Sequence, residues 1–264
     1  MWRQLPRQRL HLRLHLLRLT NAGEARKASP FLKQTKTNKI FSVSLYTLSS
    51  TKKLPVIKQP AGLTFLDSAD AELLSLLGNT SVEDVTKRLA NDHLAFVAYL
   101  HSQPAAFGWM ARGKATIGEL NHSLVLPLRH RYLWNFRTLA AFRGLGIYPA
   151  LLQHMIQYEG FKAKQFWIIH APENKASLSG IVKAGFQYVG KLYTNAEGKT
   201  AIDANEVSEL HKHSLAFMDI ALSHEATASC WNCSSPYLKK RSAECCCTTA
   251  GSECTLNNML SMAF

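Results

Sequence analysis

FRGLGIYPALL, at residues 142–152, places an arginine, two glycines and a proline directly before an apolar segment. Glycine allows tight backbone turns and puts no Cβ between the main chain and a ligand. The first N–H groups of a helix have no partner inside the helix, and together with the helix dipole they favour an anion. Pro149 suits a first helical turn, where no N–H is needed, and Arg143 supplies a charge that pairs with phosphate. Two interpretations stay open: a plain glycine turn, or a cradle for a pyrophosphate.

Around this stretch, the spacing of apolar residues and the positions of turn residues predict a series of short strands and helices. A helix between the strands at 131–139 and 165–171 makes those two strands parallel neighbours. The earlier strands follow one another directly, with Gln103 and Pro104 at one turn, and are expected to be antiparallel. The fold class is therefore α/β of the mixed, α+β kind, with a central, mostly antiparallel sheet flanked by helices. Strands are expected at 63–67, 94–102, 105–113, 116–126, 131–139, 165–171, 187–193 and 213–222, and helices at 71–78, 81–89, 148–161 and 174–186.

The charge of the chain is concentrated at its N-terminal end. The 264 residues carry a net charge of +13, but residues 1–60 hold 13 of the 31 Lys and Arg residues and a single acid, Glu24. The other 204 residues hold 18 basic and 17 acidic residues. A nucleic-acid-binding surface needs basic residues clustered on the folded body, so nucleic acid is not an expected partner. The sequence has no run of about 18 apolar residues that would suggest a membrane span.

Composition divides the chain into three parts. A basic leader and linker of low order is expected over residues 1–61, a folded domain over 62–222 and a small Cys-rich tail over 223–264. The leader begins MWRQLPRQRLHLRLHLLRL, which is rich in arginine and free of acids, as transit peptides are. Its leucines at 10, 12, 14 and 16 alternate and would scatter around a helix. We therefore expect a disordered leader on a cytoplasmic protein, with a mitochondrial transit peptide as the alternative.

All six cysteines lie in the last 35 residues, which indicates a reducing compartment and one small cysteine module. Cys230 and Cys233 have the spacing of half a tetrahedral zinc site. One or two of the run Cys245–Cys247, together with Cys254, would complete it. An iron–sulfur or redox site and unpaired thiols are the open alternatives. The predicted zinc ligands are Cys230, Cys233, Cys246 and Cys254.

Two motifs, in this order along the chain, resemble the GCN5-related N-acetyltransferase (GNAT) superfamily over roughly residues 62–222. The coenzyme motif of that family, Gln/Arg-x-x-Gly-x-Gly/Ala between a strand and a long helix, is similar to residues 141–146 here. The next family motif is an Asn followed by a helix that ends in Gly-Phe, and Asn174 and Gly185-Phe186 are similar to it. The Tyr-Pro pair at 148–149 also resembles an Arg-Gly-x-Gly-x-Tyr-Pro subgroup.

This resemblance implies transfer of an acetyl group from acetyl-CoA to an amine of a small molecule or peptide. Such enzymes work by direct attack of the amine, without a covalent enzyme intermediate. The main chain of the strand at 136–139 would then pair with the pantetheine arm, the amides of 143–148 would hold the pyrophosphate, and Asn174 would lie beside the arm. The implied coenzyme-binding residues are Arg137, Thr138, Leu139, Arg143, Gly144, Leu145, Gly146, Ile147, Tyr148 and Asn174.

Glu119 is the candidate general base, since it is expected on the strand before the glycine motif, with His122 and His130 as alternatives. Two departures from the family pattern affect the site. Ala141 stands where the motif has Gln or Arg, and Ile181 stands where many relatives have a tyrosine acid. They keep open a second interpretation, a non-catalytic acyl-CoA-binding protein with a metal-binding Cys tail.

Overall fold

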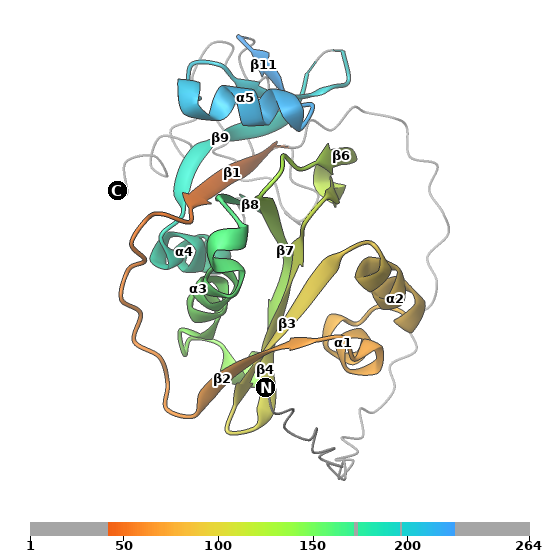
Figure 1. Ribbon diagram of the computed structural model, residues 1–264, viewed down its shortest axis with the longest axis vertical. Helices are drawn as coiled ribbons and strands as arrows, with labels where there is room; N and C mark the ends of the chain where they lie inside the picture. The colour runs from red at the N-terminus through yellow and green to blue at the C-terminus, as the bar shows by residue number, and fades with distance from the viewer. Residues whose placement is uncertain (1–41, 172–173, 196, 225–264) are drawn as a thin grey trace, which may run out of the picture. The chain divides into compact units, whose positions relative to one another are not determined.

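The computed structural model describes residues 42–171, 174–195 and 197–224 (Figure 1). They form a nine-stranded sheet in the order β11-β10-β9-β1-β8-β7-β4-β3-β2 and a separate β5-β6 hairpin. The strands are β1 (Ser42–Ser49), β2 (Leu63–Ser68), β3 (His93–Leu100), β4 (Gln103–Ala111), β5 (Lys114–Ile117), β6 (His122–Val125), β7 (His130–Thr138), β8 (Gln165–His170), β9 (Gln187–Thr194), β10 (Thr200–Asp203) and β11 (Ala221–Ser223). The helices are α1 (Ala71–Gly78), α2 (Val82–Ala90), α3 (Ile147–Glu159), α4 (Lys175–Ala184) and α5 (Glu209–Phe217), with short 3-10 turns η1 (Gly118–Leu120), η2 (Ala140–Phe142) and η3 (Gly160–Lys162).

The sheet confirms the predicted fold class. β7 and β8 are parallel neighbours, as expected from the helix between them, and β10 and β11 are also parallel. The remaining neighbours are antiparallel. Helices flank the sheet, as Figure 1 shows. Within the described ranges, no helix is long and apolar enough to span a membrane.

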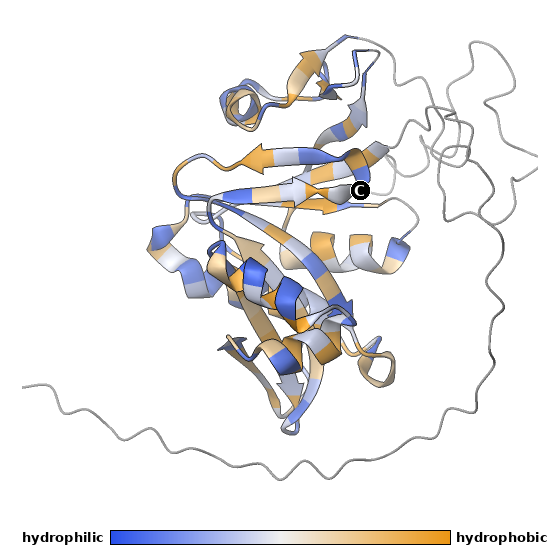
Figure 2. Ribbon diagram, turned by 90° about the vertical axis from the view of Figure 1, so that its right-hand side faces the viewer, coloured by the Kyte–Doolittle hydropathy of each residue, from blue (hydrophilic) through white to orange (hydrophobic). Residues whose placement is uncertain are grey.

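The two faces of the sheet are buried under different helices because side chains alternate along each strand. In β3, Phe96 and Ala98 pack in the core that also contains Leu151 and Met155 of α3. Their neighbours Ala95 and Val97 pack in the core that contains Leu74 of α1 and Val85 of α2. A third core lies under α5. Figure 2 shows the resulting mixture of hydrophobic and hydrophilic residues along the strands and helices.

The expectation of a linker before residue 62 is wrong for β1. This strand lies inside the sheet, between β8 and β9. It is buried on both faces, with Leu45 in one core and Leu48 in another. Its Ser and Thr residues give the segment the polar composition of a linker. However, Thr47 is buried and donates to the carbonyl of Phe166 at 2.9 Å. A hydroxyl with such a partner is compatible with a central strand.

Three other predicted elements differ from the structure. The single strand expected at 116–126 is a hairpin with η1 between its strands, because Asn121 takes a left-handed conformation with φ of 49°. The strand expected at 213–222 is mostly helix α5, which is followed by the short β11. The turn expected at Gln103 and Pro104 is instead formed by His101 and Ser102, with φ of 50° and 65°, so β4 already begins at Gln103.

A buried ionic cluster joins the end of α3 to the sheet. The Glu159 side chain is fully buried. Its Oε1 accepts from Arg112 Nη2 at 2.7 Å, and its Oε2 accepts from Arg131 Nε at 2.8 Å. Burial by itself would raise the pKa of Glu159, but the hydrogen bonds and charges of the two arginines bring it below its ordinary value. The carboxylate is therefore ionised in the folded protein at neutral pH.

Replacing Glu159 by Gln is expected to lower the free energy of unfolding by about 3 kcal/mol at pH 7, because it leaves two guanidinium groups without their buried partner. The stabilising effect of Glu159 is complete above its unfolded-state pKa of about 4.3 and is lost as the pH falls through the lower folded-state pKa. Wild type should therefore lose more stability than Glu159→Gln as the pH falls below about 5. Urea unfolding at a series of pH values measures both effects.

Lys87→Gln is the control for this prediction. The Lys87–Glu83 pair is exposed on α2, so its loss should change stability by at most about 0.5 kcal/mol. The proposed role of Glu159 is contradicted if wild type and Glu159→Gln lose stability equally on acidification.

Candidate functional site

The candidate site begins where β7 separates from β8. The two strands pair only over His130–Leu133 and Gln165–Ile168. Beyond Leu133, β7 continues to Thr138 and pairs with β4 on its other side. No strand among the described residues pairs with the opposite edge of this part of β7. Main-chain N–H and C=O groups on such an edge can pair with an extended ligand.

A β-bulge shapes the same part of β7. Trp109 pairs with Trp134 and Phe107 with Arg137, so Asn135 and Phe136 lie opposite the single residue Gly108. Asn135 has a φ of 51°, in the left-handed region. A bulge takes one residue out of the ladder and re-aims its neighbours. The Phe136 ring lies over Gly108, where a Cβ would approach it to 2.1 Å. Gly108 therefore makes room for the bulge.

Two cavities meet along the separated strands. The first has a volume of about 780 Å³ and includes Glu119, Trp134, Asn135 and Arg88 in its lining. The second has a volume of about 590 Å³ and follows the C-terminal part of β7 to the glycine stretch. Phe136, Tyr148 and Ser177 line both cavities, so these three side chains mark their junction.

The second cavity contains most of the predicted coenzyme residues. Leu139 and Leu145 do not line it. The Leu139 amide donates to the Ala105 carbonyl at 2.9 Å, so it is already paired within the fold. The eight that do line the cavity are Arg137, Thr138, Arg143, Gly144, Gly146, Ile147, Tyr148 and Asn174.

The glycine stretch forms an open N-terminal end of α3. Gly144 and Gly146 have φ of 80° and 74°, which glycine adopts without strain. Gly146 is the N-cap and has no side chain to pair with the helix amides. Within the described part of the chain, the amides of residues 144–148 have no hydrogen-bond partner. The next residue, Pro149, has no N–H at all. The stretch is thus both the predicted turn and a set of free donors at a helix N-terminus.

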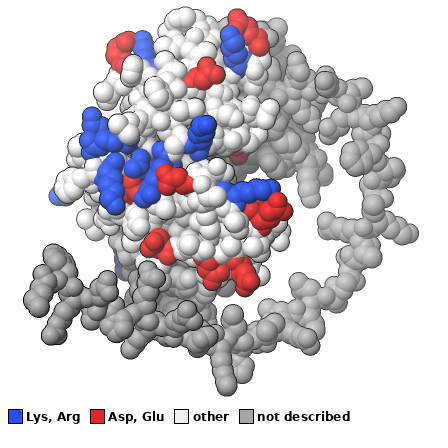
Figure 3. All heavy atoms as spheres, turned by 45° about the vertical axis from the view of Figure 1, so that its right-hand side comes forward, with Lys and Arg blue, Asp and Glu red and all other residues white. Residues whose placement is uncertain are grey.

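Basic residues line the same cavity as the glycine stretch. Arg143 is exposed, and its Nε donates to the Thr138 carbonyl at 3.2 Å. Arg137 and Lys183 also line the second cavity, which has no Asp or Glu in its lining. Because three cations and no carboxylate line the second cavity, its electrostatic setting favours an anion. Figure 3 shows the charged side chains on one face of the molecule, where several Lys and Arg side chains lie together with acidic side chains among them.

Asn174 is the N-cap of α4. Its Oδ1 accepts from the Ser177 amide at 3.0 Å, which explains why an Asn precedes this helix. The helix ends at Gly185, in a left-handed conformation with φ of 104°. Both ends of the second motif therefore have local structural roles, and Asn174 has its place in the cavity lining in addition.

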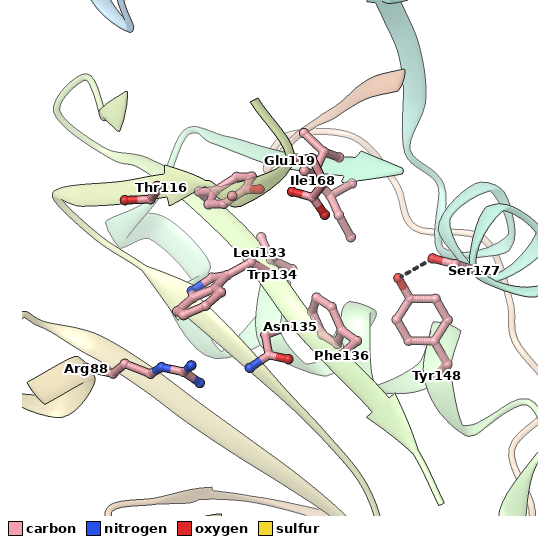
Figure 4. A pocket seen from close by; sticks show the side chains of 13 residues that line it. Arg88, Thr116, Glu119, Leu133, Trp134, Asn135, Phe136, Tyr148, Ile168 and Ser177 are labelled. Atoms are coloured by element: carbon pink, nitrogen blue, oxygen red, sulfur yellow. Dashed lines mark hydrogen bonds between the residues drawn. The ribbon is translucent and has the colours of Figure 1, made fainter. Parts of the chain in front are cut away.

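The side chain of Tyr148 is a feature that sequence analysis missed. Its hydroxyl lies 3.4 Å from Ser177 Oγ, and its ring meets Phe136 edge-on with centroids 5.2 Å apart (Figure 4). Gly180 makes room for the ring, since a Cβ there would approach Tyr148 to 2.2 Å. Burial raises the pKa of Tyr148 well above its ordinary value, so the phenol is protonated at neutral pH. Only tertiary packing brings these residues of α3, α4 and β7 together.

Glu119 lies in η1 and not on a strand, which corrects the expected setting of the candidate base. It is exposed and lines the first cavity. Its charge also contributes, after burial, to raising the pKa of Tyr132 in the same lining. The alternatives are engaged elsewhere, because His122 Nε2 contacts the Met218 carbonyl at 2.9 Å and His130 Nδ1 accepts from Trp167 Nε1 at 3.0 Å. Glu119 as catalytic base remains a prediction.

The predicted zinc ligands Cys230, Cys233, Cys246 and Cys254 lie outside the described residues, so a zinc site remains a prediction. Across the described ranges, no group of three or more His, Cys, Asp or Glu side chains could hold a metal ion.

Comparison with known proteins gives structural matches only. No family model and no curated protein sequence matches the chain. A GCN5-related N-acetyltransferase from Kribbella flavida matches with 16% identity and a TM-score of 0.36, over 49% of this chain and 48% of that chain. A GNAT acetyltransferase from Colwellia psychrerythraea matches with 14% identity and a TM-score of 0.40, over 56% of this chain and 53% of that one. The matches thus span about half the length of those two proteins.

A predicted acetyltransferase from Clostridium acetobutylicum, solved with acetyl-CoA, matches with 17% identity and a TM-score of 0.34. The match covers 47% of this chain and 90% of that chain. These identities and TM-scores are low. What the chain binds and catalyses therefore has to be inferred from its own cavities.

The bulge gives a prediction about stability. Gly108→Ala should lower the free energy of unfolding by about 1–3 kcal/mol, because the new Cβ forces the Phe136 ring to move. Gly113→Ala is the matched control, since a Cβ at Gly113 meets no atom within 4 Å, and it should change stability by at most about 0.5 kcal/mol. Chemical denaturation measures both. The double variant Gly108→Ala with Phe136→Leu should recover part of the loss, and equal effects of the two single variants would contradict the packing argument.

Proposed function

We propose that the chain is an N-acyltransferase of the GNAT type, which moves an acetyl group from acetyl-CoA to an amine acceptor by direct attack of the amine. The observation that carries this proposal is the unpaired edge of β7, which leads from the bulge at Asn135 to the free amides of residues 144–148. A long arm with amide groups that ends in a pyrophosphate has the shape and the chemistry for this path.

The residues of the second cavity fit the donor. The main chain of Arg137 and Thr138 would pair with the amide groups of the arm, next to Asn174. The amides of residues 144–148 would hold the pyrophosphate, and no Cβ covers them at Gly144 or Gly146. Arg143 and Lys183 add positive charge at the same place. Leu139 is left out of this set, because its amide is paired with the Ala105 carbonyl and the residue does not line the cavity. Leu145 does not line the cavity either, and only its free amide belongs to the set.

The reaction is proposed for the junction of the two cavities. The amine loses a proton as its nitrogen forms a bond to the acetyl carbon, and the sulfur gains a proton as the carbon–sulfur bond breaks. Glu119, in the first cavity, is the proposed acceptor of the amine proton. Tyr148, at the junction, is the proposed donor to the sulfur, with Ser177 3.4 Å from its hydroxyl. Tyr148 would thus perform the role for which Ile181, buried in the core, has no suitable group.

The bulge has a proposed part in the same step. Main-chain groups around Asn135 and Phe136 are outside the regular ladder, and both residues line the first cavity. A backbone N–H freed in this way can stabilise the acetyl oxygen as it becomes negatively charged. The alternative is an acyl-CoA-binding protein without catalysis. It would use the second cavity as the same donor groove and would differ only at the junction of the two cavities.

Binding of acetyl-CoA to the full chain tests the donor groove. Calorimetry should give a Kd between about 1 μM and 1 mM, the range of typical KM values. Gly146→Val should weaken binding at least about tenfold, because a left-handed conformation at a non-glycine residue costs roughly 1–2 kcal/mol. Gly198→Val is the matched control, since Gly198 has a similar φ of 79° in a turn between β9 and β10. Absence of binding to wild type would overturn the proposal.

Release of free thiol in the presence of an amine tests catalysis at Tyr148. Tyr148→Phe keeps the ring that packs on Gly180 and Phe136, and should lower kcat by about 100-fold or more, the usual contribution of a positioned acid. Its Kd for acetyl-CoA should stay within about threefold of wild type. Tyr158→Phe is the control, because this tyrosine is on the exposed side of α3 and should keep full activity. Acetyl-CoA binding without thiol release across an amine panel would favour the non-catalytic alternative.

A further inference from the structure

The first cavity has a cationic side chain that none of the steps above uses. Arg88 projects from α2, and its Nη1 is buried without a hydrogen-bond partner in the described structure. The indole Nε1 of Trp134 is also buried and without a partner. Both side chains line the first cavity, and Figure 4 shows Arg88 reaching from α2 toward Trp134 and Asn135. Buried donors without acceptors are rare in folded proteins and call for an explanation.

The surroundings hold Arg88 in place but do not neutralise it. Its guanidinium lies 4.9 Å from the ring centroid of Trp134 and 5.5 Å from that of Trp109. Within the described ranges no carboxylate forms an ion pair with it. Burial lowers the pKa of Arg88, and the charge of Asp84 one turn earlier offsets this in part. Arginine nevertheless stays charged in proteins, so a positive charge is held partly desolvated at the cavity wall.

A third buried atom without a hydrogen-bond partner, His93 Nδ1, lies in the same region but is not a donor to the cavity. His93 Nδ1 is buried without a partner, while its Nε2 contacts the Lys114 carbonyl at 2.9 Å. Since a carbonyl only accepts, Nε2 carries the proton and Nδ1 is an acceptor. His93 packs edge-on against Trp134 and is absent from the cavity lining. It therefore supports the indole and presents no donor to a ligand.

The cavity thus has charges of opposite sign in its lining. Arg88 and the Trp134 N–H are donors, and Glu119 is the one carboxylate among the lining residues. In Figure 4, Glu119 lies beside Ile168, on the other side of Leu133 and Trp134 from Arg88. A guanidinium fork with an adjacent N–H matches the oxygens of a carboxylate, whereas an ammonium group suits the surroundings of Glu119.

We propose that Arg88 and Trp134 form a carboxylate subsite, so that the amine acceptor of this enzyme is an amino acid or a related amine that carries a carboxylate. This proposal rests on the proposed function in one respect: that the molecule bound in the first cavity reacts through an amine. The carboxylate lies against Arg88, which leaves the amine directed toward Glu119 and the bulge at Asn135, where the two cavities meet.

Matched pairs of amines test the specificity of the subsite. Alanine is compared with ethylamine, and phenylalanine with phenethylamine, in the thiol-release assay with the full chain. Wild type should prefer the carboxylate member of each pair by about 10- to 100-fold in kcat/KM, the effect expected for a hydrogen-bonded charge. Arg88→Met should remove this preference by raising KM for the amino acids and leaving KM for the plain amines unchanged. Absence of a preference in wild type, or its persistence in Arg88→Met, overturns the proposal.

Further variants separate recognition from structure. Arg88→Lys keeps the charge without the fork and should retain part of the preference. Lys87→Met changes the neighbouring exposed cation of α2 and should behave as wild type. Melting temperature and the Kd for acetyl-CoA are measured for every variant. If Arg88→Met is unfolded, the Arg88→Lys variant provides the test instead. If Arg88→Lys prefers the amines with a carboxylate as strongly as wild type does, the proposed role of the guanidinium fork is overturned.

A binding experiment without coenzyme keeps this inference distinct from the proposed function. N-acetylphenylalanine and N-acetylphenethylamine differ by one carboxylate and are titrated into the full chain by calorimetry. Binding of the first alone, lost in Arg88→Met, supports the subsite even if acetyl-CoA does not bind and the proposed function fails. Equal binding of the two compounds, or unchanged binding in Arg88→Met, overturns the subsite. If the chain still binds acetyl-CoA and releases thiol in that case, the proposed function stands.

Discussion

The contact of Glu159 with Arg112 and Arg131 sets the geometry on which the site depends. Arg131 belongs to the short part of β7 that pairs with β8, so the buried carboxylate anchors α3 at the closed end of the two strands. The same helix begins at Ile147, directly after its N-cap Gly146, at the open end. A helix that is anchored at its C-terminal end holds its free N-terminal amides at a fixed place relative to the unpaired edge of β7.

The two cavities use different kinds of chemistry. The second is lined by the edge of β7, two glycines, the start of α3 and residues of α4. In the proposed function, the main-chain groups of this cavity recognise features that any coenzyme A thioester shares. The first is lined by residues from α2, the β5–η1 region, β7 and β8, and by Tyr148 and Ser177 at the junction. Side chains can be exchanged without changing the fold. Under the proposed function, donor recognition is therefore tied to the fold, while acceptor recognition depends on individual residues such as Arg88.

What the sequence could predict follows the same division. The glycine stretch and the Asn174–Gly185 helix are local patterns, and the structure has the turn, the two helices and the parallel pairing that the sequence predicts. Arg88 and the Tyr148–Ser177 contact have no local signature, since distant elements create them. Glu119 is expected on a strand and lies in η1. The cause is the left-handed conformation of Asn121: Asn adopts it more often than most residues do, but an Asn in the sequence does not by itself mark such a turn. A strand is expected where α5 lies, because the short apolar pattern there fits both the 3.6-residue period of a helix and the two-residue period of a strand.

The position of β1 has a consequence for the order in which the domain can assemble. β1 is made before every other described element, yet its neighbours are β8 and β9. The Gln165 amide that donates to Thr47 at 2.5 Å is 118 positions further along the chain. During synthesis from the N-terminus, β1 must remain without its native neighbours until most of the domain has been translated. Contacts so distant in sequence slow folding and leave a strand that is buried in the native sheet exposed to wrong pairing, so β1 is a segment of the nascent chain that benefits from protection until β8 and β9 have been made.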